Sequence, residues 1–191
     1  MTLAEIMRLA LRQLDEDPED VSEYDDLFRL YANQGYRIAV HEYYKPREVR
    51  CLKSNDRGMI CIAEQDIRRV VELRRVIRRA ECWQRVYFDL SPMGENLFVP
   101  AWPDTEFMAV VEVDYPDMIE GTDVPKIPES AHGALVDYVC YRHLSNGNLA
   151  KQGRAQFYLN QFYDGMRRMR PQGMGSVTRE TNLYAATDIR A

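Results

Sequence analysis

Lysine is scarce in this sequence, while arginine is abundant. The chain of 191 residues has only 4 lysines against 21 arginines, and 30 acidic side chains bring its formal net charge to −5. A free nucleic-acid-binding domain of this size is usually strongly basic, so the acidic balance argues against tight, sequence-neutral DNA binding. Arginine forms bidentate, geometrically fixed ion pairs, and its abundance favours contacts with other proteins.

Long hydrophobic runs are also missing. The N-terminal segment carries Glu5 and Arg8 within its apolar stretch, and no later window approaches the roughly 18 uninterrupted apolar residues of a membrane span. We therefore expect neither a signal peptide nor an anchor, and no membrane partner. With 46% apolar and 10% aromatic residues the chain still has enough material for a packed core, which excludes wholesale disorder.

Motifs for cofactors and metals are absent as well. There is no Gly-x-x-x-x-Gly-Lys-Ser/Thr loop, no Gly-x-Gly-x-x-Gly loop, and no histidine spacing that supplies several zinc ligands. Cysteine pairs of the Cys-x-x-Cys kind are missing too, which predicts reduced thiols and no disulfides. We expect no cofactor and no metal. The four cysteines are Cys51, Cys61, Cys82 and Cys140.

Two weak candidates for chemistry remain. Cys140 and His143 are three residues apart with Asp137 preceding them, a spacing that allows a nucleophile and a base, but burial habits favour a buried thiol and a boundary histidine. The acidic run of residues 15–20 continues to Asp26 at calcium-loop spacing, but has Asp where that loop needs Gly. A solvated charge run is the favoured interpretation.

Helical patterns occupy both ends of the chain. Thr2 and Glu5 form a capping-box pattern before a helix to Leu14. A second helix is expected from an N-cap at Ser22 to about residue 44. Its expected apolar face comprises Leu27, Leu30, Tyr31 and Ile38, with Tyr24 and Phe28 on the flank. A third should begin at residue 128 or 129, and a fourth should span about 149–170, with Phe157 among its apolar positions.

Short apolar pieces between turn residues fill the middle. Residues 59–62, 86–88, 97–99 and 108–113 read as strands. Residues 67–80 fit a helix face by spacing, but β-branching favours a strand.

This order predicts an α+β, mainly α fold. A helical bundle core domain would be built from residues 1–44 and 122–170, a β-rich insertion would span 45–121, and residues 171–191 would form an extended docking tail.

The most unusual local charge is an arginine cluster with interleaved acids. Phosphate contact is one interpretation, but the acids and the net negative charge favour a solvent or subunit face. The subunit-interface candidates are Arg68, Arg69, Arg74, Arg75, Arg78 and Arg79.

Three segments resemble a known family. They are residues 30–39 (LYANQGYRIA), residues 125–142 (PKIPESAHGALVDYVCYR) and residues 156–169 (QFYLNQFYDGMRRM). Together with the layout of residues 3–44 and 108–170, they are similar to the tailed-bacteriophage head-to-tail connector proteins, also called adaptor or head-completion proteins.

The resemblance implies a structural virion protein without catalysis, located at the head-to-tail interface and made in the host cytoplasm. Its expected partners are the portal protein, a downstream tail or nozzle protein, and further copies of itself in a ring of about twelve. Genomic DNA would pass through the ring during packaging and ejection without sequence-specific binding.

The polar tail fits a segment that orders on a partner. We expect its apolar residues, namely Val177, Leu183, Tyr184 and Ile189, to dock on the portal or on a neighbouring subunit. A frayed terminus is the alternative. Three alternative functions stay open for the whole chain. It could be another tail-assembly subunit, a cytosolic enzyme with an unrecognised site or a regulatory binding module.

Overall fold

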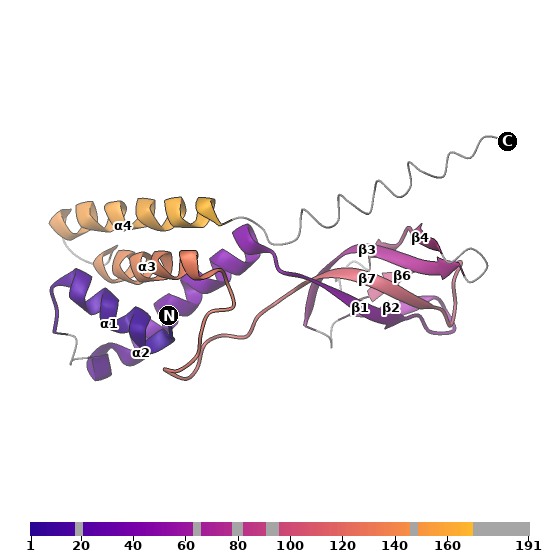
Figure 1. The fold of residues 1–191 in the computed structure, drawn as a ribbon, viewed down its shortest axis with the longest axis horizontal. Coiled ribbons are helices and arrows are strands. Elements are labelled where there is room, and N and C mark those ends of the chain that lie inside the picture. Colours follow the sequence, from indigo (N-terminus) through magenta and orange to yellow (C-terminus); the bar gives the residue numbers. More distant parts are fainter. Residues whose placement is uncertain (18–20, 63–65, 78–81, 91–95, 146–148, 170–191) are drawn as a thin grey trace. The chain divides into compact units, whose positions relative to one another are not determined.

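The computed structural model describes residues 1–17, 21–62, 66–77, 82–90, 96–145 and 149–169, and it combines α-helices with two antiparallel sheets (Figure 1). The chain divides into two compact units. The helical unit comprises Met1–Tyr44 and the chain from Tyr115 onward, and the β unit comprises Lys45–Asp114. The β unit is inserted into the helical one, and it ends at Asp114 rather than at the expected residue 121.

Helix α1 (Leu3–Leu14) begins with the expected capping box. The Glu5 amide donates to Thr2 Oγ1 at 3.3 Å, and the Thr2 amide donates to Glu5 Oε2 at 2.8 Å. Six residues at helical spacing form its buried stripe, as the sequence predicts. They are Leu3, Ile6, Met7, Ala10, Leu11 and Leu14.

Helix α2 (Val21–Ile38) continues as a π-helical turn, η2 (Ala39–Tyr44). The expected N-cap at Ser22 is wrong, because Ser22 already lies inside the helix. The expected apolar face is wrong in part: Tyr31 is buried as expected and Ile38 packs against the core, but Leu27 and Leu30 are 41% and 50% exposed. Phe28, expected on the flank, is buried. The buried stripe is aromatic and rotated from the expected one. It consists of Phe28, Tyr31, Ala32, Tyr36 and Ala39.

Helices α3 (His132–Ser145) and α4 (Leu149–Arg168) lie side by side, and a 3-10 turn, η3 (Glu129–Ala131), leads into α3 (Figure 1). Phe162 and Met166 of α4 are fully buried, but Phe157 is 59% exposed, so its expected apolar role is wrong. Gly165 allows the two helices to approach closely, since a Cβ there would lie 2.6 Å from Ala134 Cβ.

The chain returning from the β unit is bound to α2 by polar contacts. The Asn33 side chain bonds both backbone groups of Met118, and the Tyr36 hydroxyl accepts from the Lys126 amide at 3.1 Å. These bonds attach residues 115–127 to the helical unit, which is why the β unit ends before them.

The β unit contains a four-stranded and a three-stranded antiparallel sheet. The strand order is β1-β7-β3-β4 in the first and β2-β6-β5 in the second. The strands are β1 (Arg47–Lys53), β2 (Met59–Cys61), β3 (Ile67–Ile77), β4 (Cys82–Val86), β5 (Asp89–Leu90), β6 (Asn96–Phe98) and β7 (Glu106–Val113).

Sequence expectations for this unit have mixed outcomes. The strand interpretation of residues 67–80 is confirmed over Ile67–Ile77, and residues 78–80 lie outside the described part of the chain. The strand expected at 86–88 is displaced, because β4 ends at Val86. Strand β1 is not expected from the sequence, since its charged residues give no apolar alternation.

A tight turn joins β1 to β2. Gly58 has φ of 69°, and a Cβ there would lie 2.6 Å from the Val99 carbonyl oxygen. Asn55 Oδ1 accepts from the amides of Arg57 and Met59 at 3.0 and 2.8 Å, which fixes the turn. Glycine is the residue that tolerates both this conformation and this contact.

Among the helices of the described residues, none is long and apolar enough to span a membrane.

Candidate interaction surface

Strand pairing assembles the arginines of the four-stranded sheet into rows. Arg47 of β1 pairs with Glu112 of β7, which in turn pairs with Arg69 of β3. Directly paired residues share one face of a sheet. We call this face the outer face. It carries Arg47, Val49, Cys51, Lys53, Arg69, Glu72, Arg74, Arg85, Glu106, Met108, Val110 and Glu112.

Carboxylates stand between arginines on the outer face. Glu112 is only 4% exposed, and one of its oxygens lies 3.3 Å from Arg47 Nη2. Glu72 lies 3.0 Å from Arg74 and 3.9 Å from Arg85. Because the acids neutralise the cations locally, the arrangement suits protein contacts better than phosphate binding.

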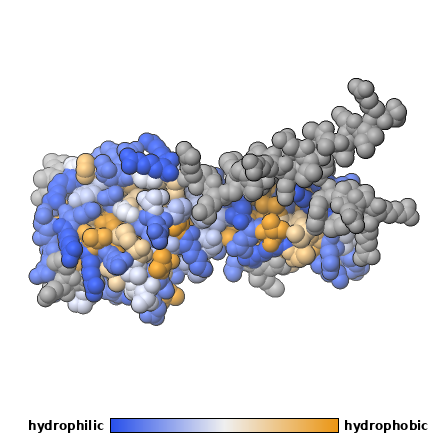
Figure 2. Space-filling view, viewed as in Figure 1, coloured by the Kyte–Doolittle hydropathy of each residue, from blue (hydrophilic) through white to orange (hydrophobic). Residues whose placement is uncertain are grey.

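Apolar side chains lie among these charges. Val49 is 61% exposed, and its neighbour Cys51 places Sγ 3.9 Å from Met108 Sδ. On the view in Figure 2, hydrophobic residues are exposed between hydrophilic ones on both units. The outer face therefore combines an apolar strip with paired arginines, a composition found at protein interfaces.

Arg75 does not belong to the outer face. Its strand partner is Gln84, and it lies on the same face as Leu73, which is fully buried. Its guanidinium carbon lies 3.5 Å from the centre of the Trp102 ring, a cation–π contact inside the unit. Of the arginines expected at one interface, Arg69 and Arg74 therefore lie on the outer face and Arg75 on the opposite face of the sheet.

The other expected interface residues have separate outcomes. Arg68 and Arg69 are exposed, Arg74 is half-buried, and Arg78 and Arg79 lie outside the described residues. The tail residues expected to dock, Val177, Leu183, Tyr184 and Ile189, also lie outside the described part of the chain.

Cys140 and His143 are not joined as a catalytic pair. Cys140 Sγ donates to Gln13 Oε1 at 3.4 Å, and burial, with Asp137 nearby, raises the pKa of the thiol to about 12. His143 contacts the edges of the Tyr24 and Phe28 rings, and burial lowers its pKa. A thiol held in this way is a poor nucleophile.

Asp137 is a half-buried carboxylate on α3. Burial raises its pKa to about 6. Within the described residues no hydrogen-bond donor is paired with it, so nothing offsets its desolvation.

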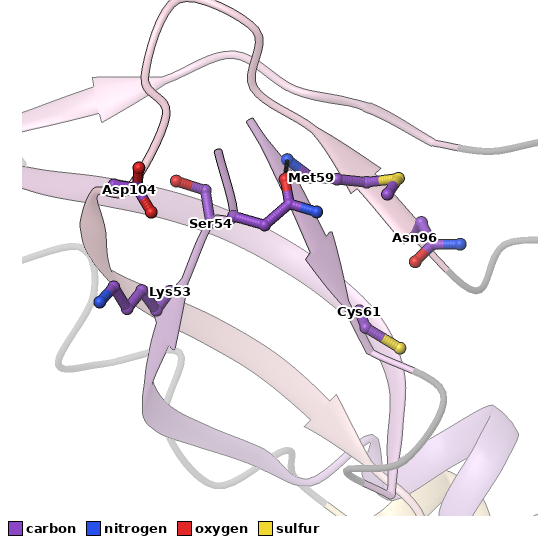
Figure 3. Close-up of a pocket in the computed structure, with 7 residues that line it drawn as sticks. Lys53, Ser54, Met59, Cys61, Asn96 and Asp104 are labelled. Atoms are coloured by element: carbon purple, nitrogen blue, oxygen red, sulfur yellow. Dashed lines mark hydrogen bonds between the residues drawn. The ribbon is translucent and has the colours of Figure 1, made fainter. Parts of the chain in front are cut away.

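A cavity of about 390 Å³ opens beside the ends of β1, β2 and β6 (Figure 3). Two of its polar side chains, Ser54 and Asn55, are engaged in hydrogen bonds within the unit. Ser54 Oγ donates to the Trp102 carbonyl at 2.6 Å, and Asn55 holds the turn described above. Lys53 and Asp104 also line it. The cavity is thus better explained by the turn architecture than by a ligand.

Metal ligands do not gather within the described residues, where no group of three His, Cys, Asp or Glu side chains is close enough. Residues 18–20 of the acidic run lie outside them, so the calcium-loop alternative is outside the structure's description. Among the described residues, Cys51, Cys61 and Cys140 form no disulfide.

Sequence reasoning missed the residues that organise the outer face. Glu112 and Arg47 are far apart in the chain, and only the register of β1 on β7 brings them together. The charges of Arg47–Lys53 fall at positions 47, 48, 50 and 53, which lie on both faces of a strand, so the sequence held no local signal for this pairing.

Comparison with models of known protein families finds no match for this chain, and comparison with curated proteins finds no match either.

Proposed function

We propose that this chain is a structural virion protein, a head-to-tail adaptor that forms a ring under the portal, extends the DNA channel and joins the capsid to the tail. The observation that carries the proposal is topological. A helical unit made from both ends of the chain holds an inserted β unit, the layout that the sequence resemblance implies.

The three segments with the resemblance all belong to the helical unit. Residues 30–39 lie on α2 and its π-helical end, residues 125–142 lead into and form most of α3, and residues 156–169 lie on α4 and just beyond it. In this proposal the helices form a bundle that is the conserved framework of a mainly α protein, and the β insertion varies.

The negative charge of the helical unit supports a channel through which DNA passes without being bound. All of the net charge of −5 belongs to the helical unit, because residues 45–114 contain equal numbers of acidic and basic side chains. An acidic channel wall would let a polyanion slide, since it offers few cations to hold phosphates.

Paired arginines of the β unit would then serve contacts between copies. Heterologous contacts close into a ring when the rotation between neighbours is right, and about twelve copies would match the portal ring above. A downstream tail or nozzle protein would bind the opposite end. No catalysis, cofactor or membrane is part of the proposal.

Electron microscopy of the purified chain with and without a candidate portal ring tests the proposal. We expect portal rings to gain a second tier when the chain is added. Particles without that tier would contradict the adaptor role and favour another tail-assembly subunit or a binding module.

A deletion tests the tail. Removing residues 172–191 should abolish docking while the helical unit stays folded, as judged by far-UV circular dichroism. A matched variant keeps the length and replaces the four apolar tail residues by serine, which separates their contacts from the tail's bulk. Docking that persists in both variants would contradict the tail's role. The replaced residues are Val177, Leu183, Tyr184 and Ile189.

The enzyme alternative has its own test. Alanine at Cys140 or His143 should abolish the activity of an enzyme that used them, and leave docking to the portal unchanged in an adaptor. Because Cys140 is fully buried, Cys140→Ser serves as a milder variant if the alanine change unfolds the chain.

A further inference from the structure

One edge of the four-stranded sheet is open. Strand β1 is the terminal strand of its sheet, and within the described residues no strand pairs with its other side. An edge of this length presents unpaired backbone donors and acceptors, which can add a further strand.

Two hydrogen bonds at the ends of β1 establish which of its residues point to that open edge. The Ser54 amide donates to the Thr105 carbonyl at 3.0 Å, and the Val113 amide donates to the Pro46 carbonyl at 3.2 Å. In an antiparallel pair, hydrogen-bonded positions alternate with non-hydrogen-bonded ones. The even-numbered residues of β1 therefore bond β7, and the odd-numbered residues direct their amides and carbonyls to the open edge.

The side chains on β1 are self-complementary about Val49. Glu48 and Arg50 flank it with opposite charges, and Val49 itself is 61% exposed. Two copies of β1 placed antiparallel with Val49 opposite Val49 bring Glu48 of each copy opposite Arg50 of the other. In this register Val49 is a hydrogen-bonded pair, and Glu48–Arg50 falls at the closer, non-hydrogen-bonded positions.

Neighbouring registers lack this match. Centring the pair on Arg50 places two arginines opposite each other and sets Arg47 against Lys53, and centring it on Glu48 opposes two carboxylates. Like charges directly opposite destabilise a strand pair. The charges that protect many edge strands by repulsion thus favour the register centred on Val49 over its two neighbours.

We infer that the free chain forms a two-fold dimer through antiparallel pairing of β1 with β1 of a second copy, centred on Val49. The four charges then alternate in sign around the two-fold axis. Within one chain, Arg50 Nη2 already lies 3.0 Å from Glu48 Oε2, so the side chains need little rearrangement to extend the network. Both copies use the same edge, which closes the contact at two copies.

The dimer is independent of the adaptor proposal. It is measured without a portal, so its absence leaves portal docking untouched, and failure to dock leaves the dimer untouched.

Sedimentation velocity of the full chain over a concentration series tests the inference. We expect dimers that dissociate on dilution. Val49→Pro removes an amide that points only to the open edge and should leave the β1–β7 ladder in place. We expect that variant to be monomeric where the unchanged chain is dimeric. A chain that is monomeric at every concentration, or a dimer that Val49→Pro leaves unchanged, would overturn the inference.

Charge reversals test the register. Glu48→Arg opposes two arginines across the axis, and Arg50→Glu opposes two carboxylates, so each variant alone should dimerise about tenfold more weakly. An equimolar mixture of the two variants restores opposite charges at both positions, and should recover dimers that contain one copy of each. Variants that dimerise as strongly alone as in the mixture would contradict this register.

Discussion

Asn33 holds Met118 by both ends of its side-chain amide. Its Nδ2 donates to the Met118 carbonyl at 2.9 Å, and its Oδ1 accepts from the Met118 amide at 2.8 Å. The pair is buried and 85 residues apart in the chain. A single side chain thus satisfies both backbone groups of the segment that returns from the β unit.

Replacing Asn33 by Leu should destabilise the helical unit by about 2–4 kcal/mol, because two buried backbone groups lose their partners. Denaturant unfolding followed by far-UV circular dichroism measures this. Gln34→Ala, one position away, is the control and should shift the free energy of unfolding by less than about 0.5 kcal/mol. Equal losses of stability in the Asn33 and Gln34 variants would contradict the role of the Asn33–Met118 hydrogen bonds.

Asp137 should make stability depend on pH. Its pKa is raised by burial to about 6 in the folded chain, against an ordinary value of 3.8. The folded state therefore binds the proton more tightly, and this carboxylate destabilises the fold at pH above 6, with the penalty vanishing as pH falls below 3.8.

Asp137→Asn should accordingly raise the free energy of unfolding by about 1–2 kcal/mol at neutral pH, and the gain over the unchanged chain should shrink on acidification. Urea unfolding at a series of pH values gives both numbers. Asp164→Asn, an exposed position on α4, is the control. A gain that does not depend on pH would show that desolvation of the charge is not its cause.

Replacing either of two glycines of α4 by alanine should change the stability, and the two changes should have opposite signs. A Cβ at Gly165 would lie 2.6 Å from Ala134 Cβ, whereas one at Gly153 would meet nothing within 4 Å. Gly165→Ala should therefore destabilise by about 1–3 kcal/mol through overpacking. Gly153→Ala should stabilise by about 0.5–1 kcal/mol, since alanine is the better helix former. Thermal unfolding of both variants under the same conditions checks the difference in sign.

Replacing Glu112 should destabilise the β unit far more than replacing Glu106, although both residues lie on the outer face of β7. Glu112→Gln leaves Arg47 without its buried carboxylate, and should cost about 1–3 kcal/mol. Exposed Glu106→Gln should change stability by less than about 0.5 kcal/mol. Both tryptophans, Trp83 and Trp102, belong to the β unit, so tryptophan fluorescence follows its unfolding separately. Similar losses for the two variants would contradict the buried role of Glu112.

The sequence predicts best where a local rule decides. The Thr2–Glu5 capping box and the spacing of the α1 stripe need no partner to be recognised. The apolar spacing of the β3 segment also fits a helix, but its β-branched residues favour a strand, and the segment is a strand.

Prediction fails where distant partners decide. On α2, Leu27 and Phe28 are adjacent and both apolar, and only packing against α3 selects which one is buried. The end of the insertion depends on the bonds from Asn33 to Met118. In each case the deciding contact joins segments far apart in sequence.

The insertion also has a consequence for the order of folding during synthesis. Residues Lys45–Asp114 are contiguous and can complete their two sheets as soon as they are free of the ribosome. Helices α1 and α2 emerge earlier, but their buried faces pack against α3, which is made only after the whole β unit. Until then α1 and α2 can pack only against each other, and the parts of their apolar stripes that α3 covers stay exposed. A chaperone that binds the nascent chain would find its earliest site there.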